Sequence, residues 1–168
     1  DGHSRTDDHK LQISIKPSPE ATMNLSTSTD EDVPAKLDFS AQQQNGESGE
    51  TITAVRINKT DLDSATDFSL TFGAEGSALN GTEAGVTLDG DWYVLDVTAM
   101  ENIYLKGDAN WHGTGSFGVR YEVTDPGNNT GAGSASSLSD EQTYTINVNP
   151  ITDQPDLTLG SAEDISLD

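Results

Sequence analysis

The chain has 168 residues, of which 29 are Asp or Glu and 8 are Lys or Arg, giving a formal net charge of −21, and it contains no cysteine. This charge excludes a nucleic-acid-binding surface, which needs the opposite sign, and disfavours attachment to anionic lipid. The lack of cysteine excludes a disulfide framework and a Cys-based zinc site, and no apolar run is long enough to insert into a membrane. Only 32% of the residues are apolar, a composition close to that of disordered chains, so the hydrophobic pattern must decide whether this chain folds.

The hydrophobic pattern indicates β-strands. Four segments alternate apolar and polar residues, namely 53–57, 68–72, 117–123 and 144–148. A period of two places one face of a strand on a core and the other in water. Residues 92–97 are apolar on both faces and are predicted to form a more central strand, Ile103 and Leu105 mark a short one, and residues 98–102 are expected to form one helical turn at most.

Turn-rich segments separate these predicted strands. Gly, Asn, Asp and Ser cluster in residues 45–49, 73–85, 107–115 and 126–140. Short strands divided by turns are typical of an antiparallel β-sandwich, so the predicted fold class is all-β. Residues 126–140 are predicted to form a flexible hairpin loop.

The two ends of the chain resemble each other. Residues 25–33 read LSTSTDEDV and residues 157–165 read LTLGSAEDI, so Leu, Glu and Asp recur at an offset of 132 residues, the difference between 157 and 25. The offset predicts one repeat of a tandem array. The expected division is an N-terminal flank and linker over 1–24, a β-sandwich repeat over 25–150, and a linker with the start of the next repeat over 151–168.

Carboxylates gather at the turns and linkers rather than along strand faces. Ca²⁺ binds six to eight oxygens from carboxylates, amides and backbone carbonyls, and loops rich in Asp, Asn and Gly supply them. A charge of −21 is hard to hold compact without cations, although any single Asp is also explained as a solvated turn residue. Neither an EF-hand nor an RTX nonapeptide spacing is present. The candidate ligands at turns are Asp30, Glu50, Asp89, Asp91, Asp108 and Asp125.

Five segments carry a resemblance to a known family: STDEDVPAKLDFS (28–40), ETITAVRI (50–57), GVTLDGDWYV (85–94), GDANWHGTGSFGVRYEVTD (107–125) and TINVNPITDQPDL (145–157). In this order the chain resembles the cadherin-like, immunoglobulin-like tandem repeats, or extender domains, of giant bacterial RTX adhesins and biofilm-associated proteins. The resemblance implies a secreted Ig-like β-sandwich on the bacterial cell surface, with Ca²⁺ at the linkers stiffening a stalk. The chain departs from the family at residues 41–50, AQQQNGESGE, where Gln and Asn stand in place of Asp.

The resemblance also implies a set of calcium ligands. They lie in the opening and exit motifs and in the equivalent positions of the neighbouring repeats: Glu31, Asp32, Asp153, Asp156, Glu20, Glu163 and Asp164. The expected partners are neighbouring repeats of the same chain, and the chain is expected to be monomeric.

The sequence is compatible with two different functions. The first is an extender repeat that spaces a ligand-binding region from the cell, in adhesion and biofilm formation. The second is a ligand-binding module of the same type of adhesin, for a surface carbohydrate or peptide, with Trp92, Trp111 and His112 as contact candidates, although packing also explains both tryptophans. An enzyme is not expected, because no carboxylate pair stands out and no histidine has a metal-ligand spacing such as HExxH.

Overall fold

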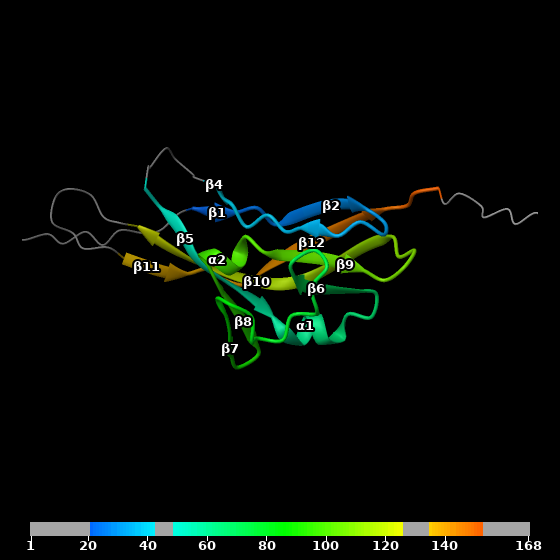
Figure 1. The fold of residues 1–168 in the computed structure, drawn as a ribbon. Coiled ribbons are helices and arrows are strands. Elements are labelled where there is room, and N and C mark those ends of the chain that lie inside the picture. Colours follow the sequence, from blue (N-terminus) through cyan, green and yellow to red (C-terminus); the bar gives the residue numbers. More distant parts are fainter. Residues whose placement is uncertain (1–20, 43–48, 126–134, 153–168) are drawn as a thin grey trace, which may run out of the picture.

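A computed structural model describes residues 21–42, 49–125 and 135–152 of the chain. Strands dominate these ranges and helices are short, so the all-β prediction is confirmed (Figure 1). Neither helix among the described residues has the length or the apolar character that crossing a bilayer would require. The strands form two main layers with a core between them.

The larger layer is a seven-stranded sheet. Along its main path the strand order is β2 (Ser26–Asp30), β12 (Gln142–Asn149), β10 (Gly113–Asp125), β5 (Thr51–Asn58), β8 (Trp92–Asp96) and β7 (Val86–Asp89). The prediction of a more central strand over 92–97 is confirmed for residues 92–96, because β8 pairs with β5 on one side and β7 on the other, while Val97 lies beyond the end of the strand. The seventh strand, β11 (Ala135–Leu138), pairs with the second half of β10. Part of the predicted loop 126–140 is therefore a strand, and residues 126–134 lie outside the described ranges.

The smaller layer has three strands in the order β3 (Ala35–Lys36), β9 (Ile103–Gly107) and β6 (Phe68–Phe72). A separate pair, β1 (Thr22–Met23) and β4 (Ala41–Gln42), joins the start of the described chain to the segment after β3. Ala21 and Met23 are buried in the core, so the described core begins upstream of Leu25, the predicted start of the repeat.

The core fills the space between the two layers. The large sheet contributes buried side chains at alternate positions, and the small sheet contributes Leu70, Ile103 and Leu105. Tyr144 and Phe117 stack in the centre, with ring centroids 5.3 Å apart. Burial of such a cluster is the main favourable term in folding, and the disorder suggested by the composition is thereby overcome.

One predicted alternation breaks at a β-bulge. The pairing of β5 with β10 shifts between Glu122 and Val123, so that Ile52 pairs with Val123 and Ala54 pairs with Glu122. A bulge places two residues of one strand opposite one residue of its partner. Ile52 and Val55 are consequently both buried although they are three positions apart.

Two short helices close the gaps between strands. The first, α1 (Lys59–Ser64), was not predicted from the sequence, and Asn58 caps it. The Asp61 carboxylate on α1 accepts the backbone N–H of Gly118, at 2.7 Å. Gly118 lies in β10, just beyond the last residue of that strand that pairs with β5. Helix α2 (Val97–Met100), capped by Asp96, confirms the single helical turn predicted here.

The described chain begins and leaves at opposite ends of the sandwich (Figure 1). This follows from the pairing of β2 with β12, which is parallel and runs from Ser26 opposite Thr145 to Asp30 opposite Asn149. Because the first and last strands of the large sheet run in the same direction, Ala21 lies near one end and Thr152 near the other.

Candidate functional site

Three loops meet at the end where β12 leaves the sandwich, which we call the exit end. They are residues 30–33, from the last residue of β2 onward, residues 108–112 between β9 and β10, and residues 149–152, from the last residue of β12 onward. The Glu31 N–H donates to the Asn149 carbonyl, at 2.9 Å. A side-chain oxygen of Glu31 accepts the N–H of Ile151, at 2.7 Å, and one of Asp32 accepts the N–H of Asn110, at 3.1 Å. Two neighbouring acidic residues thus connect all three loops.

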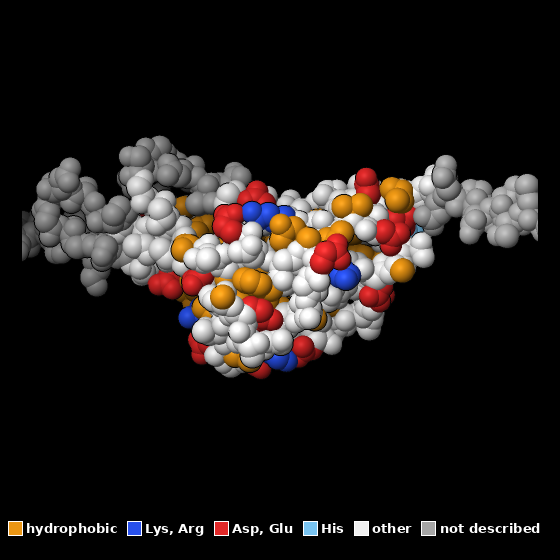
Figure 2. All heavy atoms as spheres, in the orientation of Figure 1, with side chains coloured by type: hydrophobic (Ala, Val, Ile, Leu, Met, Phe, Trp, Pro, Cys, Tyr) orange, Lys and Arg blue, Asp and Glu red, His pale blue; other side chains and the backbone are white. Residues whose placement is uncertain are grey.

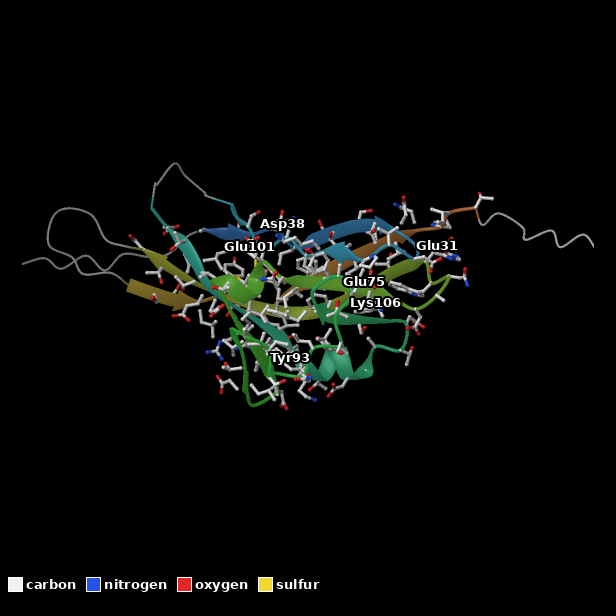
Figure 3. All side chains as sticks on the ribbon, in the orientation of Figure 1. Glu31, Asp38, Glu75, Tyr93, Glu101 and Lys106 are labelled. Atoms are coloured by element: carbon white, nitrogen blue, oxygen red, sulfur yellow. The ribbon has the colours of Figure 1, made fainter. Side chains whose placement is uncertain are left out.

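Glu31 is a buried carboxylate, with 4% of the residue exposed. Its Oε1 accepts the Ile151 N–H, and its Oε2 lies 3.3 Å from Nδ1 of His112. A buried carboxylate costs free energy unless hydrogen bonds or opposite charges compensate it. Figure 3 shows Glu31 at the exit end, far along the sandwich from Asp38 and Glu101. Burial and position together make Glu31 the distinctive residue of this end.

The backbone at the exit end adopts an uncommon conformation. Asp32 and Asn110 both have a φ of 60°, and they are the two non-glycine residues with positive φ among the residues described. Asp and Asn tolerate this left-handed region better than other residues, because their short side chains hydrogen-bond locally. Unusual backbone geometry concentrates at functional sites, and here it lies on two loops that the Asp32 carboxylate joins.

Two further predicted ligands lie in the same loops. Asp30 accepts a hydrogen bond from the Asn149 side chain, at 3.3 Å. Asp108 begins the 108–112 loop, and its carbonyl accepts the N–H of Trp111, at 3.0 Å. The exit end therefore brings together the loops of four predicted residues: Asp30, Glu31, Asp32 and Asp108.

The remaining described candidates lie elsewhere. Glu50, which is buried, precedes β5, and Asp125 ends β10; both lie beside the pair formed by Thr51 and Thr124, at the opposite end of the sandwich. Asp89 and Asp91 flank the turn between β7 and β8, where Asp89 forms an ion pair with Arg56, at 2.6 Å. Five predicted ligands lie outside the described residues: Glu20, Asp153, Asp156, Glu163 and Asp164.

The carboxylate and carbonyl oxygens at the exit end are of the type that binds a hard cation, but the described residues supply too few of them to complete its coordination shell. Carboxylate and carbonyl oxygens are the ligands that Ca²⁺ prefers, in shells of six to eight. Across residues 21–42, 49–125 and 135–152, no three His, Asp or Glu side chains converge closely enough to hold a metal ion. Further oxygens from the chain beyond Thr152, from a neighbouring repeat or from water would be needed to complete a shell.

The aromatic residues considered for ligand contact are packed. The Arg120 guanidinium lies over the Trp92 ring, 4.8 Å from its centroid, and Trp111 stacks on Phe68 at 5.5 Å. Both tryptophans are half-buried, whereas His112 is exposed. Packing against Arg120 and Phe68 therefore accounts for the positions of both indole rings.

A shallow pocket of about 260 Å³ lies between the residues around Asp38 and those around Glu101. Neither Trp nor Tyr lines it; its walls include Phe39, Met100 and the Lys36–Glu101 ion pair, whose atoms are 2.6 Å apart. The backbone N–H of Ser40, helped by the Asn24 amide, lowers the pKa of the Asp38 carboxyl. The pocket thus resembles a surface hollow between solvated charges more than a sugar-stacking site.

Acidic side chains are spread over the face shown in Figure 2, and basic ones occur at fewer places. Several of the basic residues are already paired with carboxylates: Lys36, Arg56, Lys59 and Arg120. The excess negative charge must therefore be balanced by ions from solution. No protein-family model, no curated protein and no solved structure matches this chain.

Proposed function

We propose that this chain is a calcium-stabilised extender repeat of a bacterial cell-surface adhesin, working outside the cell as a spacer with no chemistry of its own. The observation that supports it most is the parallel pairing of β2 with β12. A domain that begins at one end and leaves at the other adds its full length to a tandem array. Had the first and last strands run in opposite directions, successive repeats would fold back on one another.

The exit end suits a joint between repeats. Glu31 and Asp32 connect the β2–β3 loop, the β9–β10 loop and the departing chain. In the proposal Glu31 and Asp32, with Asp30 and Asp108 as further candidates, supply only part of the Ca²⁺ shell, because no three described carboxylates converge closely enough by themselves. Asp153 and Asp156 of the linker supply further oxygens. The ion neutralises carboxylates and links the exit loops to the chain that follows, which limits the angles available to the next repeat.

The ligand-binding alternative has less support. Trp92 and Trp111 pack against Arg120 and Phe68. Saccharide sites combine concavity with aromatic faces, and the pocket beside Asp38 has neither Trp nor Tyr in its wall. The extender function requires no such site.

Calcium titration calorimetry on the Glu31→Gln variant tests the proposal. Glutamine keeps the shape of the side chain but removes its charge, and calcium affinity depends on the number of charged ligands. We expect the tightest class of calcium sites to weaken by about tenfold or more, a change of roughly 1.4 kcal/mol. The matched control is Glu101→Gln, which changes an exposed carboxylate beside Lys36 and should leave the isotherm unchanged. A wild-type chain that binds no calcium, or equal isotherms for wild type and Glu31→Gln, would sink the proposal.

A further inference from the structure

The loop between β6 and β7 contains Asn80 followed by Gly81. An asparagine side chain can be attacked by the backbone nitrogen of the next residue, and glycine at that place leaves the approach open. Asn80 is exposed to water. This loop is remote in sequence from the exit end and takes no part in the proposed function.

Both sides of the loop are anchored in the core. Leu79 is buried, and its N–H donates to the Leu70 carbonyl at 2.8 Å. After the turn, Val86 is buried, and its N–H donates to the Glu83 carbonyl at 3.0 Å. Gly81 has a φ of +86°, a conformation that favours glycine. The turn is therefore held in one arrangement, which reduces the entropy lost on reaching a reactive geometry.

Glu83 is positioned to accept a proton from the attacking nitrogen. Its Oε2 accepts the Gly81 N–H at 2.9 Å, and its Oε1 accepts the Asn80 N–H at 2.9 Å. The two bonds fix the carboxylate against this dipeptide. A general base must lie about 2.6–3.2 Å from the atom whose proton it takes, and Glu83 does.

The Asn80 side chain is held at its oxygen. Its Oδ1 accepts the N–H of Thr82 at 3.0 Å and the hydroxyl of Thr82 at 2.6 Å. Attack on the adjacent Cγ would place negative charge on this oxygen. Two donors already aimed at the atom where charge develops lower the barrier without reorganisation.

From this geometry we infer that Asn80 is a self-modification site, at which the fold promotes deamidation. The Gly81 nitrogen gives its proton to Glu83 and forms a bond to Asn80 Cγ. The Cγ–Nδ2 bond then breaks, and the proton leaves with Nδ2 as ammonia, closing a five-membered imide. Water opens the imide at either carbonyl and leaves an aspartate or an isoaspartate at position 80. The overall reaction consumes one water molecule and needs no oxidant or reductant.

The product changes the loop. Either opening adds one negative charge beside Glu83, whose carboxylate now holds the loop through the two backbone N–H groups. The new carboxylate and the Glu83 carboxylate carry like charges and repel each other. The isoaspartate form also lengthens the main chain by one carbon, next to Gly81 and the Leu88 side chain that packs on it. Conversion therefore loosens the link between β6 and β7.

Peptide mapping by mass spectrometry tests the inference. The full chain is incubated at neutral pH and 37 °C, and deamidation at Asn80 is followed over time. The reference is the free peptide ALNGTEAG, residues 78–85, which contains the same groups without the fold. We expect Asn80 in the protein to deamidate at least about tenfold faster than in the peptide, less than the roughly hundredfold that a positioned base or an oxyanion donor contributes in enzymes.

Variants identify the groups responsible. Glu83→Gln should slow Asn80 in the protein the most, to near the rate of the peptide, and Thr82→Val, which removes the hydroxyl, should slow it by a smaller factor. Glu75→Gln, which changes an exposed carboxylate five residues before Asn80 in the same loop, is the matched control and should change nothing. The second Asn-Gly pair, Asn45–Gly46, gives an internal reference whose rate Glu83→Gln should not alter. A protein that deamidates at Asn80 no faster than the peptide overturns the inference, whether or not the variants fold, and so does an unchanged rate in folded Glu83→Gln.

Discussion

Tyr144 is a polar residue at the centre of the core. Its hydroxyl accepts the N–H of Asp38 at 3.3 Å and donates to the Asp38 carbonyl at 3.4 Å. Burial raises the pKa of this hydroxyl from 10.0 to about 12. Because the folded pKa lies above the unfolded one, the neutral form favours the native state. That contribution is complete below pH 10 and is lost as the pH rises toward 12.

The Tyr144→Phe variant should therefore change how stability depends on alkaline pH. At neutral pH the free energy of unfolding should fall by about 1 kcal/mol, because the bonds to the Asp38 backbone are lost. Between pH 10 and 12 the decline should be shallower than in wild type, because one buried titrating group has been removed. Urea unfolding at pH 7, 10 and 11 measures both effects. Parallel pH profiles for the two proteins would contradict the role given to the hydroxyl.

At the exit end, some features could be predicted from the sequence and others could not. Glu31 and Asp32 were expected to be ligands from a family resemblance, whereas nothing in the pattern indicated that Glu31 is buried or that His112 lies beside it. Those contacts join residues about 80 and 120 positions apart, and a local pattern carries no information on such separations. The positive φ of Asn110 had one weak local signal, its place in a Gly-, Asp- and Asn-rich segment.

Helix α1 could not be predicted from the sequence. Its six residues are too few for a helical period to be recognised. The available signal was its cap, because the Asn58 side chain accepts the N–H groups of Thr60 and Asp61. Strands were missed for a related reason: β2 reads STSTD, with no apolar member, so period-two alternation could not reveal it. Strands with one apolar face, such as β12, were predicted correctly.

The cap of α1 can be tested by mutation. Asn58→Ala should lower the free energy of unfolding by about 1 kcal/mol, the usual contribution of an N-cap. The loss should be accompanied by faster amide hydrogen exchange at Gly118, because α1 carries the Asp61 carboxylate that accepts a hydrogen bond from this N–H. Thermal melts and exchange measurements provide the comparison, with Thr60→Ala, an exposed position on the same helix, as the control. Equal stability and exchange in Asn58→Ala and Thr60→Ala would show that the cap is unimportant.

The arrangement of the whole molecule connects the charge of −21 to the proposed tandem array. The chain begins at one end and leaves at the other, and the exit end holds the buried Glu31. The offset between residues 25–33 and 157–165 indicated a repeat, but it could not indicate whether repeats run head to tail or fold back. That depends on the direction of β2 relative to β12, which only the fold determines.

A chain of two consecutive repeats should respond to calcium in its overall shape. With calcium bound at the joint, small-angle scattering should report a rod close to twice the length of one domain. Without calcium, carboxylates at the joint repel and the linker is free to bend, so the maximum dimension should shrink and the profile should broaden. Identical scattering profiles in calcium and in chelator would mean that the ion does not set the angle between repeats.

The melting temperature of the chain in calcium and in EDTA tests whether calcium stabilises the fold. Both samples must have the same ionic strength, set with NaCl, because screening alone relieves repulsion in so acidic a protein. Calcium binding to the native state predicts that EDTA lowers the melting temperature by more than about 10 °C, or roughly 3–5 kcal/mol of linked binding for a domain of this size. Melting curves that coincide in calcium and EDTA would contradict the account.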